Sequence, residues 1–293
     1  MKLCEKMQLI EKISDMKEYS LKVRKEGKTI GFVPTMGYLH EGHLSLIRAA
    51  RKECDAVVVS IFVNPMQFGP KEDFKEYPRD LERDKGLAGE AGADIVFYPS
   101  SEEMYSEGFS TFVNVEGRYT ETLCAFSRPG HFKGVATVVL KLLNIVSPDV
   151  SYFGQKDAQQ AAVIKKMIKD LNMDTDIRIM PIVREDDGLA MSSRNVYLSE
   201  DERRQALNLY RSLEKAKEMV CGGEASSTAI KSEMKRIIEE GKDLKIDYIE
   251  TVDADSLEPV ETVKENTLIA VAVFIGKTRL IDNIIIGDIN DKG

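Results

Sequence analysis

Residues 29–52 read TIGFVPTMGYLHEGHLSLIRAARK, and this stretch indicates the fold class most clearly. It opens with a short apolar run at 29–33 and closes with residues 44–52, where Leu44, Ile47 and Ala50 share one helical face. A turn containing glycines and histidines lies between these two runs. A strand, a turn and a helix in this order are typical of the unit from which parallel sheets are built.

The same alternation continues through the first 180 residues. Strands are predicted at 56–63, 94–98, 150–153 and 175–180, and helices at 80–91, 135–146 and 157–171. The run AVVVSIFV at 56–63 suits a strand that is buried on both faces. Strands that alternate with helices predict a Rossmann-like α/β domain with a parallel sheet and right-handed crossovers.

The pattern changes after about residue 185. The segment REDDGLAMSSRN at 184–195 is polar and turn-rich, and it indicates a linker or an active-site loop. Ser199 and Glu202 form a capping box at the start of a predicted helix. That helix runs to about residue 220, a second covers 227–240, and strands are predicted at 246–252, 268–273 and 279–286. We therefore expect two domains, 1–184 and a smaller α+β lid domain at 185–293.

The composition excludes several classes of protein. The chain has 293 residues with 41 Lys and Arg against 49 Asp and Glu, so its net charge of -8 argues against nucleic-acid binding. Its 4 cysteines form no CxxC pair, which argues against a disulfide scaffold or a structural zinc site. The first residues are charged too early for a signal peptide, and no apolar stretch spans a bilayer. We expect a cytoplasmic protein with no membrane partner.

The strongest candidate site is PTMGYLHEGH at 34–43. His40 and His43 are three residues apart, so both can lie at a helix N-terminus, where the helix dipole and free N–H groups favour a phosphate. Gly37 and Gly42 let the backbone bend and approach a ligand closely. The alternative is a metal pair or two surface histidines, but the spacing is not HExxH and no third ligand cluster is evident.

Two further polar segments follow predicted strands. Asn64 and Gln67 suit a ligand rich in hydroxyl and carboxylate oxygens, or they belong to an ordinary polar turn. Lys156 lies at a predicted helix start, where it can meet a phosphate, and Gln160 lies on the same helical face. Asp157 can equally be a plain N-cap of that helix.

Two loops carry weaker signals. The segment MSSRN at 191–195 offers hydroxyls, backbone amides and an arginine to a phosphate, but it is weak on its own. The third histidine, His131, lies between Arg128 and Lys133, and a structural role and an anion-facing role have equal weight. GKT at 276–278 lacks the required earlier glycine of a Walker A loop. No GxGxxG follows a strand, so no dinucleotide redox cofactor is expected.

Six ordered segments together resemble the pantoate–β-alanine ligase family, within the HIGH-motif nucleotidyltransferase superfamily. They are PTMGYLHEGH, FVNPMQFGP, RPGHFKGVATVVLKL, YFGQKDAQQ, MSSRN and TRLIDN. HEGH alone is shared with the wider superfamily, whereas FVNPMQFGP and RPGHF narrow the resemblance to this family. One departure is the turn at 123–125, LCA, where the family commonly has a glycine. The last residues, GDINDKG, extend past the usual end and read as a disordered tail.

The resemblance implies an ATP-dependent condensation of pantoate with β-alanine to pantothenate, through a pantoyl adenylate. It implies Mg²⁺ with ATP, with Asp84 as the best candidate for a metal ligand, and a homodimer. The alternatives are another HIGH-type nucleotidyltransferase that acts on a small phosphate ester, and a nucleotide-sensing module on the same fold.

The matching motifs also imply the site residues. The implied catalytic residues are His43, His40, Lys156 and Arg194. The implied ATP-binding residues are Met36, Gly37, His40, Gly42, His43, Gly154, Gln155, Lys156, Asp157, Val183, Met191, Ser192, Ser193 and Arg194, with Val183 contacting adenine through its backbone. Those for pantoate are Gln67, Gln160 and Asn64, and Gln67 also lies near β-alanine.

Overall fold

The computed structural model describes residues 7–70, 72–242 and 244–287. They form two compact units. Unit 1 comprises the chain up to Val115 together with Arg128–Gly154 and Val163–Met180, and unit 2 comprises Glu116–Ser127, Gln155–Ala162 and the chain from Pro181. The predicted disordered tail falls mainly on residues 288–293, which lie outside the described residues.

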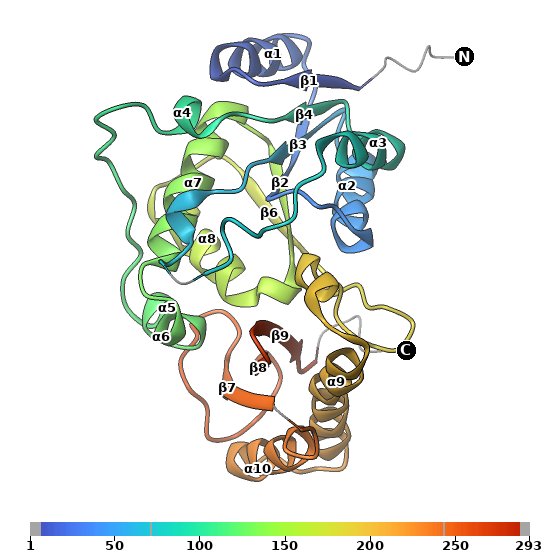
Figure 1. Ribbon diagram of the computed structural model, residues 1–293. Helices are drawn as coiled ribbons and strands as arrows, with labels where there is room; N and C mark the ends of the chain where they lie inside the picture. The colour runs from blue at the N-terminus through green and yellow to red at the C-terminus, as the bar shows by residue number, and fades with distance from the viewer. Residues whose placement is uncertain (1–6, 71, 243, 288–293) are drawn as a thin grey trace. The chain divides into compact units, whose positions relative to one another are not determined.

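Unit 1 is built on a six-stranded parallel sheet with the order β1-β4-β3-β2-β5-β6 (Figure 1). The strands are β1 (Gln8–Ile10), β2 (Ile30–Thr35), β3 (Ala56–Ile61), β4 (Ile95–Phe97), β5 (Val150–Gly154) and β6 (Asp176–Met180). Because β2 pairs with β3 on one side and with β5 on the other, the direction of winding reverses beside β2. In such sheets, ligands bind outside the carboxyl ends of the strands at this point.

Helices cover both faces of this sheet. The main ones are α1 (Ile13–Lys25), α2 (Glu41–Glu53), α3 (Leu81–Ala91) and α7 (His131–Val146), with a short α4 at Ser101–Met104 and a 3-10 turn η1 at Pro65–Gln67. Helices α2 and α3 lie on one side of the sheet and α7 on the other (Figure 1). The core between α2 and the strands contains fully buried Val33, Ile47 and Val59.

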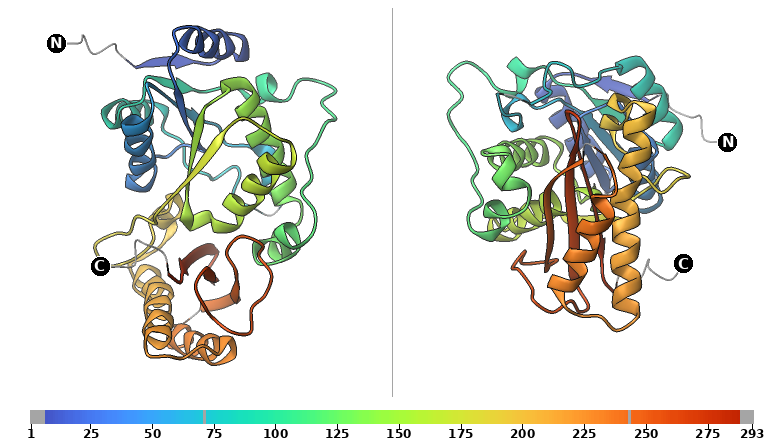
Figure 2. Two further views of the ribbon diagram at one scale, coloured as in Figure 1. Left: turned by 180° about the vertical axis from the view of Figure 1, so that it is seen from behind. Right: turned by 60° about the horizontal axis from the view of Figure 1, so that its bottom comes forward.

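Unit 2 is a three-stranded antiparallel sheet covered by two helices. Its elements are β7 (Leu244–Asp253), β8 (Thr267–Ile275), β9 (Thr278–Ile285), α9 (Glu200–Cys221) and α10 (Ser227–Ile238), with short helices α5 (Arg118–Glu121) and α6 (Cys124–Ser127) and 3-10 turns η2 (Gln155–Asp157) and η3 (Ser193–Tyr197). Figure 2 (right) shows α9 running beside the three strands, with α10 next to it. Helix α8 (Ala158–Asp170) begins in unit 2 and ends in unit 1.

The central strand β8 is buried on both faces. Ile269, Val271 and Val273 pack in a cluster with residues of α9 and α10. Leu268 and Ala270 alternate with them and pack in a second cluster with Leu123 and Ala162. The segments 116–127 and 155–162 therefore belong to unit 2 because they cover the second face of its sheet.

The predicted fold class is confirmed: a Rossmann-like parallel sheet accompanies a smaller α+β part. The capping box at Ser199 and Glu202 is also confirmed at the start of α9, since the side chain of each residue accepts from the backbone N–H of the other. Strand β1, helix α1 and the short helices α4, α5 and α6 were not predicted from the sequence. Among the described helices, none combines the length and the apolar character that crossing a membrane requires.

Candidate active site

The turn after β2 is held by a buried carboxylate. Gly37 and Tyr38 have φ of 84° and 50°, and a Cβ on Gly37 would lie 2.9 Å from the side chain of Ile61. This left-handed turn directs two backbone N–H groups at Asp84: Tyr38 N donates to Oδ2 at 2.6 Å, and Leu39 N donates to Oδ1 at 2.7 Å. Asp84, on the first turn of α3, thereby fixes the turn that leads to the histidines.

Asp84 is only 1% exposed. Burial raises the pKa of this carboxyl above its ordinary value, although the two backbone N–H groups and the Arg83 guanidinium at 3.3 Å oppose the rise. Both oxygens of the predicted metal ligand are therefore already engaged within unit 1. Among the described residues, no group of three or more His, Cys, Asp and Glu side chains gathers as a metal site would require.

His40 and His43 lie side by side at the start of α2, as predicted. Their ring centroids are 4.1 Å apart, and His40 is the N-cap residue of the helix. Nδ1 of His40 accepts from Gly42 N at 3.2 Å, and Nδ1 of His43 accepts from His40 N at 3.3 Å. A nitrogen that accepts carries no proton, so each neutral ring carries its proton on Nε2. Two N–H donors thus lie at the positive end of a helix dipole.

A cavity of about 420 Å³ opens at the carboxyl edge of the sheet beside this turn. Met36, Gly37 and Asp84 contribute to its wall, together with residues that follow β3 and β4. Its volume lies within the range of small-ligand sites, roughly 300–1,000 Å³. The predicted ATP residues Met36 and Gly37 therefore border an open space in unit 1.

Asn64 and Gln67 are buried and bonded to each other. Asn64 Nδ2 donates to Gln67 Oε1 at 3.1 Å and to Gly134 O at 3.2 Å. Asn64 Oδ1 accepts from Met66 N and from the Tyr105 hydroxyl. The amide of Asn64 is thus saturated by protein groups, whereas Gln67 Nε2 makes a contact of 3.1 Å to Met36 Sδ. Gln67 and Met36, predicted for different substrates, lie together.

The RPGHF segment belongs to a hydrogen-bonded chain that ends on the backbone of Gln67. Glu72 accepts two bonds from Arg128, at 2.8 and 2.9 Å. Arg128 Nη1 lies 2.9 Å from His131 Nε2, and His131 Nδ1 lies 2.8 Å from Gln67 O. Burial alone would raise the pKa of Glu72, but the bonds and charge of Arg128 outweigh it and hold that pKa below its ordinary value.

The predicted phosphate segment after β5 is fastened to β9. Asn283 Nδ2 donates to the carbonyl oxygens of Gln155 and Lys156, each at 3.0 Å, and its Oδ1 accepts from Gln155 Nε2 at 3.3 Å. Beyond its chain neighbours, no described atom lies within 4 Å of where a Cβ on Gly154 would be. The Lys156 ammonium lies 3.4 Å from the Asp157 carboxylate, and both residues are in η2, directly before α8.

The predicted triphosphate loop is part of a small hairpin in unit 2. Met191 N donates to Val183 O at 3.0 Å, and Ser192 is the N-cap residue of η3, where its hydroxyl accepts from Arg194 N. Asn195 Nδ2 donates to Glu185 at 2.7 Å, which holds the two arms of the hairpin together. Met191 to Arg194 and Val183, all predicted to bind ATP, therefore belong to one folded segment.

A buried ion pair anchors this hairpin. Arg184 donates to both oxygens of Asp282, at 2.6 and 3.0 Å, and Asp282 is 3% exposed. Burial raises the pKa of Asp282, while Arg184 opposes the rise. Asp282 and Asn283 thus hold both predicted ATP loops of unit 2. The motif TRLIDN contains these two residues, but the resemblance implied no role for them. The available signal was that both interrupt the otherwise apolar run at 280–286.

The adjacent glutamines of α8 differ sharply. Gln159 is buried; its Oε1 accepts from Cys124 N at 2.9 Å, and its Nε2 donates to the carbonyl oxygens of Tyr119 and Thr122. Gln160, predicted for pantoate, is half-buried. The turn at 123–125, where the sequence departs from the family, is thus anchored through Gln159.

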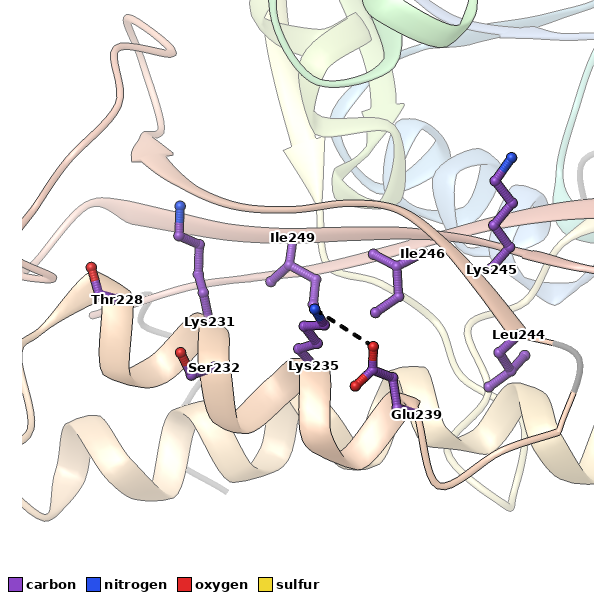
Figure 3. Close-up of a pocket in the computed structure, with 9 residues that line it drawn as sticks. All are labelled: Thr228, Lys231, Ser232, Lys235, Glu239, Leu244, Lys245, Ile246 and Ile249. Carbon is purple, nitrogen blue, oxygen red and sulfur yellow. Dashed lines mark ion pairs between the residues drawn. The ribbon is translucent and has the colours of Figure 1, made fainter.

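A second hollow lies in unit 2, between α10 and the edge strand β7 (Figure 3). It measures about 670 Å³, and Lys231, Lys235 and Lys245 extend around Ile246 and Ile249. Lys231 and Lys235 pair with Glu250 and Glu239. None of the predicted ATP or pantoate residues lines it, so it is separate from the candidate active site.

Comparisons with known proteins decide the family. The family model of pantoate–β-alanine ligase matches residues 8–285. The chain is 61% identical over 280 residues to the pantothenate synthetase of Caldicellulosiruptor bescii, which covers 96% of this chain and 99% of that protein. It is 57% identical over 281 residues to that of Thermotoga petrophila, covering 96% of this chain and 100% of the relative. The chain belongs to the pantoate–β-alanine ligase family.

Solved structures of this family agree. The pantothenate synthetase of Thermus thermophilus superposes with a TM-score of 0.91 at 43% identity, covering 95% of this chain and 99% of that one. The pantoate–β-alanine ligase of Francisella tularensis, solved with a β,γ-ATP compound and β-alanine, gives a TM-score of 0.81 at 36% identity, covering 95% and 97%. The resemblance drawn from six motifs is confirmed, and the enzyme class is that of an ATP-dependent ligase.

Proposed function

We propose that this pantoate–β-alanine ligase forms pantothenate in two steps on the residues described above. The carboxylate of pantoate attacks the α-phosphorus of ATP, which gives pantoyl adenylate and releases pyrophosphate. The amine of β-alanine then attacks the acyl carbon of the adenylate, loses a proton, and AMP leaves. No covalent bond to the protein is needed, so catalysis rests on positioning and on neutralising charge.

The observation that carries this proposal is the histidine pair at the start of α2. Because both Nδ1 atoms accept backbone N–H groups, both rings carry their N–H donor on Nε2. We assign His43 and His40 to the α-phosphate, where negative charge grows as the pantoate carboxylate attacks. The helix N-terminus adds a favourable potential for the same anion.

The remaining ATP contacts follow from the loops. We assign the phosphates to Lys156 and Arg194, which with the two histidines complete the catalytic set. The backbone of Val183 is assigned to adenine; its carbonyl already accepts from Met191, so its N–H is the group assigned to the base. The other assigned ATP residues are Met36, Gly37, Gly42, Gly154, Gln155, Asp157, Met191, Ser192 and Ser193. The open space beside Gly154 supports a close ligand approach there.

Pantoate and β-alanine are assigned to two glutamines. Gln67 keeps amide hydrogen-bonding capacity beyond its contact with Met36, so it can hold pantoate oxygens and later β-alanine. Gln160 is assigned to pantoate as well. Asn64 acts in the pantoate site through Gln67, because its own amide is saturated while it holds Gln67 Oε1.

Mg²⁺ fits this site as a companion of ATP. The ion retains several waters and takes one or two protein carboxylates at most, so a preformed cluster is not required. Asp84 is a carboxylate that borders the cavity beside Gly37. Its Oδ1 accepts from Leu39 N and from Arg83, whereas its Oδ2 keeps a lone pair besides the one used by Tyr38 N. When bound, the ion supplies charge neutralisation on the phosphates.

Three further assignments concern the whole protein. Nucleotide and pantoate binding is assigned to residues 1–184, and residues 185–293 are assigned to a smaller lid domain, whose compact unit also takes in residues 116–127 and 155–162. A homodimer is the proposed assembly, which sedimentation at several protein concentrations tests. The cytoplasm is the proposed location, because its ATP supply and reducing conditions suit a chain with separated thiols.

A coupled assay for AMP and pantothenate, with each substrate omitted in turn, tests the reaction. Formation of both products should require ATP, pantoate and β-alanine together, and ATP–pyrophosphate exchange should require pantoate alone. Exchange driven instead by a phosphomonoester would overturn the proposed reaction. Lys156→Ala tests the site: full turnover in that variant would contradict its assignment, whereas a loss with normal melting temperature supports it.

A further inference from the structure

The sequence left two equal roles for His131, structural or anion-facing, and its surroundings decide between them. Arg128 and Gln67 occupy both ring nitrogens. A guanidinium has only N–H donors, so the Nε2 atom that faces Arg128 must accept. Nδ1 therefore carries the proton of the neutral ring and donates to Gln67 O. The ring is 8% exposed, and through these two contacts both nitrogens are directed at protein groups.

The tautomer of His131 is set by the Glu72–Arg128 ion pair. Glu72 accepts two parallel hydrogen bonds from Arg128. The side chain of Glu72 is only 24% exposed and that of Arg128 only 17%. This pair orients the guanidinium so that Nη1 meets His131 at 2.9 Å. An ionised Glu72, a fixed Arg128 and a neutral His131 thus form a directional chain that ends on the backbone of Gln67.

The start of α7 packs closely against the turn that contains Gln67. A Cβ on Gly134 would lie 2.6 Å from the carbonyl carbon of Met66 and 2.7 Å from the amide nitrogen of Gln67, closer still to the Met66 oxygen. Only glycine permits this approach of helix backbone to turn backbone. Gly134 O also accepts from Asn64, which in turn holds the Gln67 side chain.

We infer that His131 is a positioning residue for pantoate. Its Nδ1–H donates to the carbonyl oxygen of Gln67 and thereby fixes the backbone of that residue, and the Glu72–Arg128 pair sets the tautomer that makes this bond possible. The inference rests on the proposed role of Gln67. Side chain and backbone of Gln67 are then held independently, the first by Asn64 and the second by His131. Displacement of the backbone moves the amide that faces the substrate, so pantoate binding should weaken while ATP binding does not.

Two His131 variants separate donation from bulk. His131→Phe keeps a ring of similar size without a donor, and His131→Asn supplies an N–H close to the Nδ1 position. We expect His131→Phe to raise the KM for pantoate about tenfold, because a buried carbonyl loses its partner. The KM for ATP should change less than about twofold, and His131→Asn should restore most of the pantoate KM. Equal changes in both KM values, or no rescue by asparagine, would overturn the inference.

Gln67→Ala distinguishes this inference from the proposed function. If Gln67→Ala leaves the pantoate KM unchanged, the assignment of Gln67 fails whatever His131 does. If Gln67→Ala raises it and a folded His131→Phe does not, only the role of His131 fails. Should His131→Phe not fold, Arg128→Met provides the test, because it frees the tautomer while leaving the ring. A selective rise in pantoate KM supports the inference, and unchanged kinetics overturns it.

Discussion

The histidines of unit 1 use their backbone partners in opposite senses. In His40 and His43, Nδ1 accepts from a backbone N–H, which leaves the proton on Nε2. In His131, Nδ1 lies against a backbone carbonyl and Nε2 against a guanidinium, which puts the proton on Nδ1. The first arrangement places the ring's donor on the nitrogen remote from the backbone, and the second engages both nitrogens within the protein.

This difference shows what a histidine motif alone leaves open. The residue type is the same, and each lies at or near a helix start. The group that faces Nδ1 selects the tautomer, and the tautomer decides whether the ring can meet a phosphate or only hold another residue. His40 and His43 should therefore affect chemistry, whereas His131 and its neighbours should affect substrate placement and stability.

The largest effect is expected at the histidine pair at the start of α2. His43→Ala should lower kcat/KM by roughly 10²–10³-fold, as the loss of one donor at a developing anion does elsewhere. The melting temperature should change little, because His43 is half-buried at a helix end. Steady-state kinetics with the coupled assay measures it. Lys52→Ala on the exposed end of the same helix is the control, and a His43→Ala enzyme as active as that control would contradict the assignment.

A smaller effect is expected where α7 meets the Gln67 turn. Gly134→Ala should destabilise the protein by about 1–3 kcal/mol, because the added methyl forces backbone apart from backbone. It should also raise the pantoate KM. Gly86→Ala in α3 is the matched control, since its Cβ position is open; alanine there should stabilise by up to ~1 kcal/mol. Thermal unfolding of both variants decides, and equal melting temperatures would refute close packing at Gly134.

The smallest effect concerns Glu72 and depends on pH. Its pKa is lower in the folded protein than the ordinary 4.5, so its ionised form contributes stability above pH 4.5. That contribution is lost as the pH falls through the folded pKa. Glu72→Gln should therefore unfold more easily at pH 7, by about 1 kcal/mol, and the gap should close in acid. Denaturant titrations at both pH values check this, and a gap that persists at low pH would contradict it.

The local sequence pattern was sufficient to predict the elements next to the carboxyl edge of the sheet. The apolar run of β2, the spacing in α2 and the histidines three residues apart all lie within residues 29–52. Pattern was not enough for β1, which has three residues and exists through its pairing with β4, or for α1, which buries only Met16, Ser20 and Val23. Such elements depend on tertiary contacts that no short window contains.

The candidate site likewise has one part that the local sequence predicts and another that depends on contacts between distant residues. Residue types and spacing were sufficient to propose which loops face a phosphate. The partners that orient those loops are distant in sequence: Gln67 and His131 are 64 residues apart, and Gln155 and Asn283 are 128 apart. The tautomers of the histidines follow from these partners, so they require the folded structure. Asp84 illustrates the point, because its hydrogen bonds to the Tyr38 and Leu39 amides were not evident from its sequence position.

The packing on the second face of β8 limits how the chain can be divided into soluble fragments. The chain passes between the two units at residues 115–116, 127–128, 154–155, 162–163 and 180–181. A fragment that starts after residue 184 omits Leu123 and Ala162, so it leaves Leu268 and Ala270 without their cover. An uncovered apolar sheet face promotes aggregation. A soluble C-terminal piece would therefore need residues 116–127 and 155–162 grafted back, and a split enzyme should be cut in an exposed loop away from these crossings.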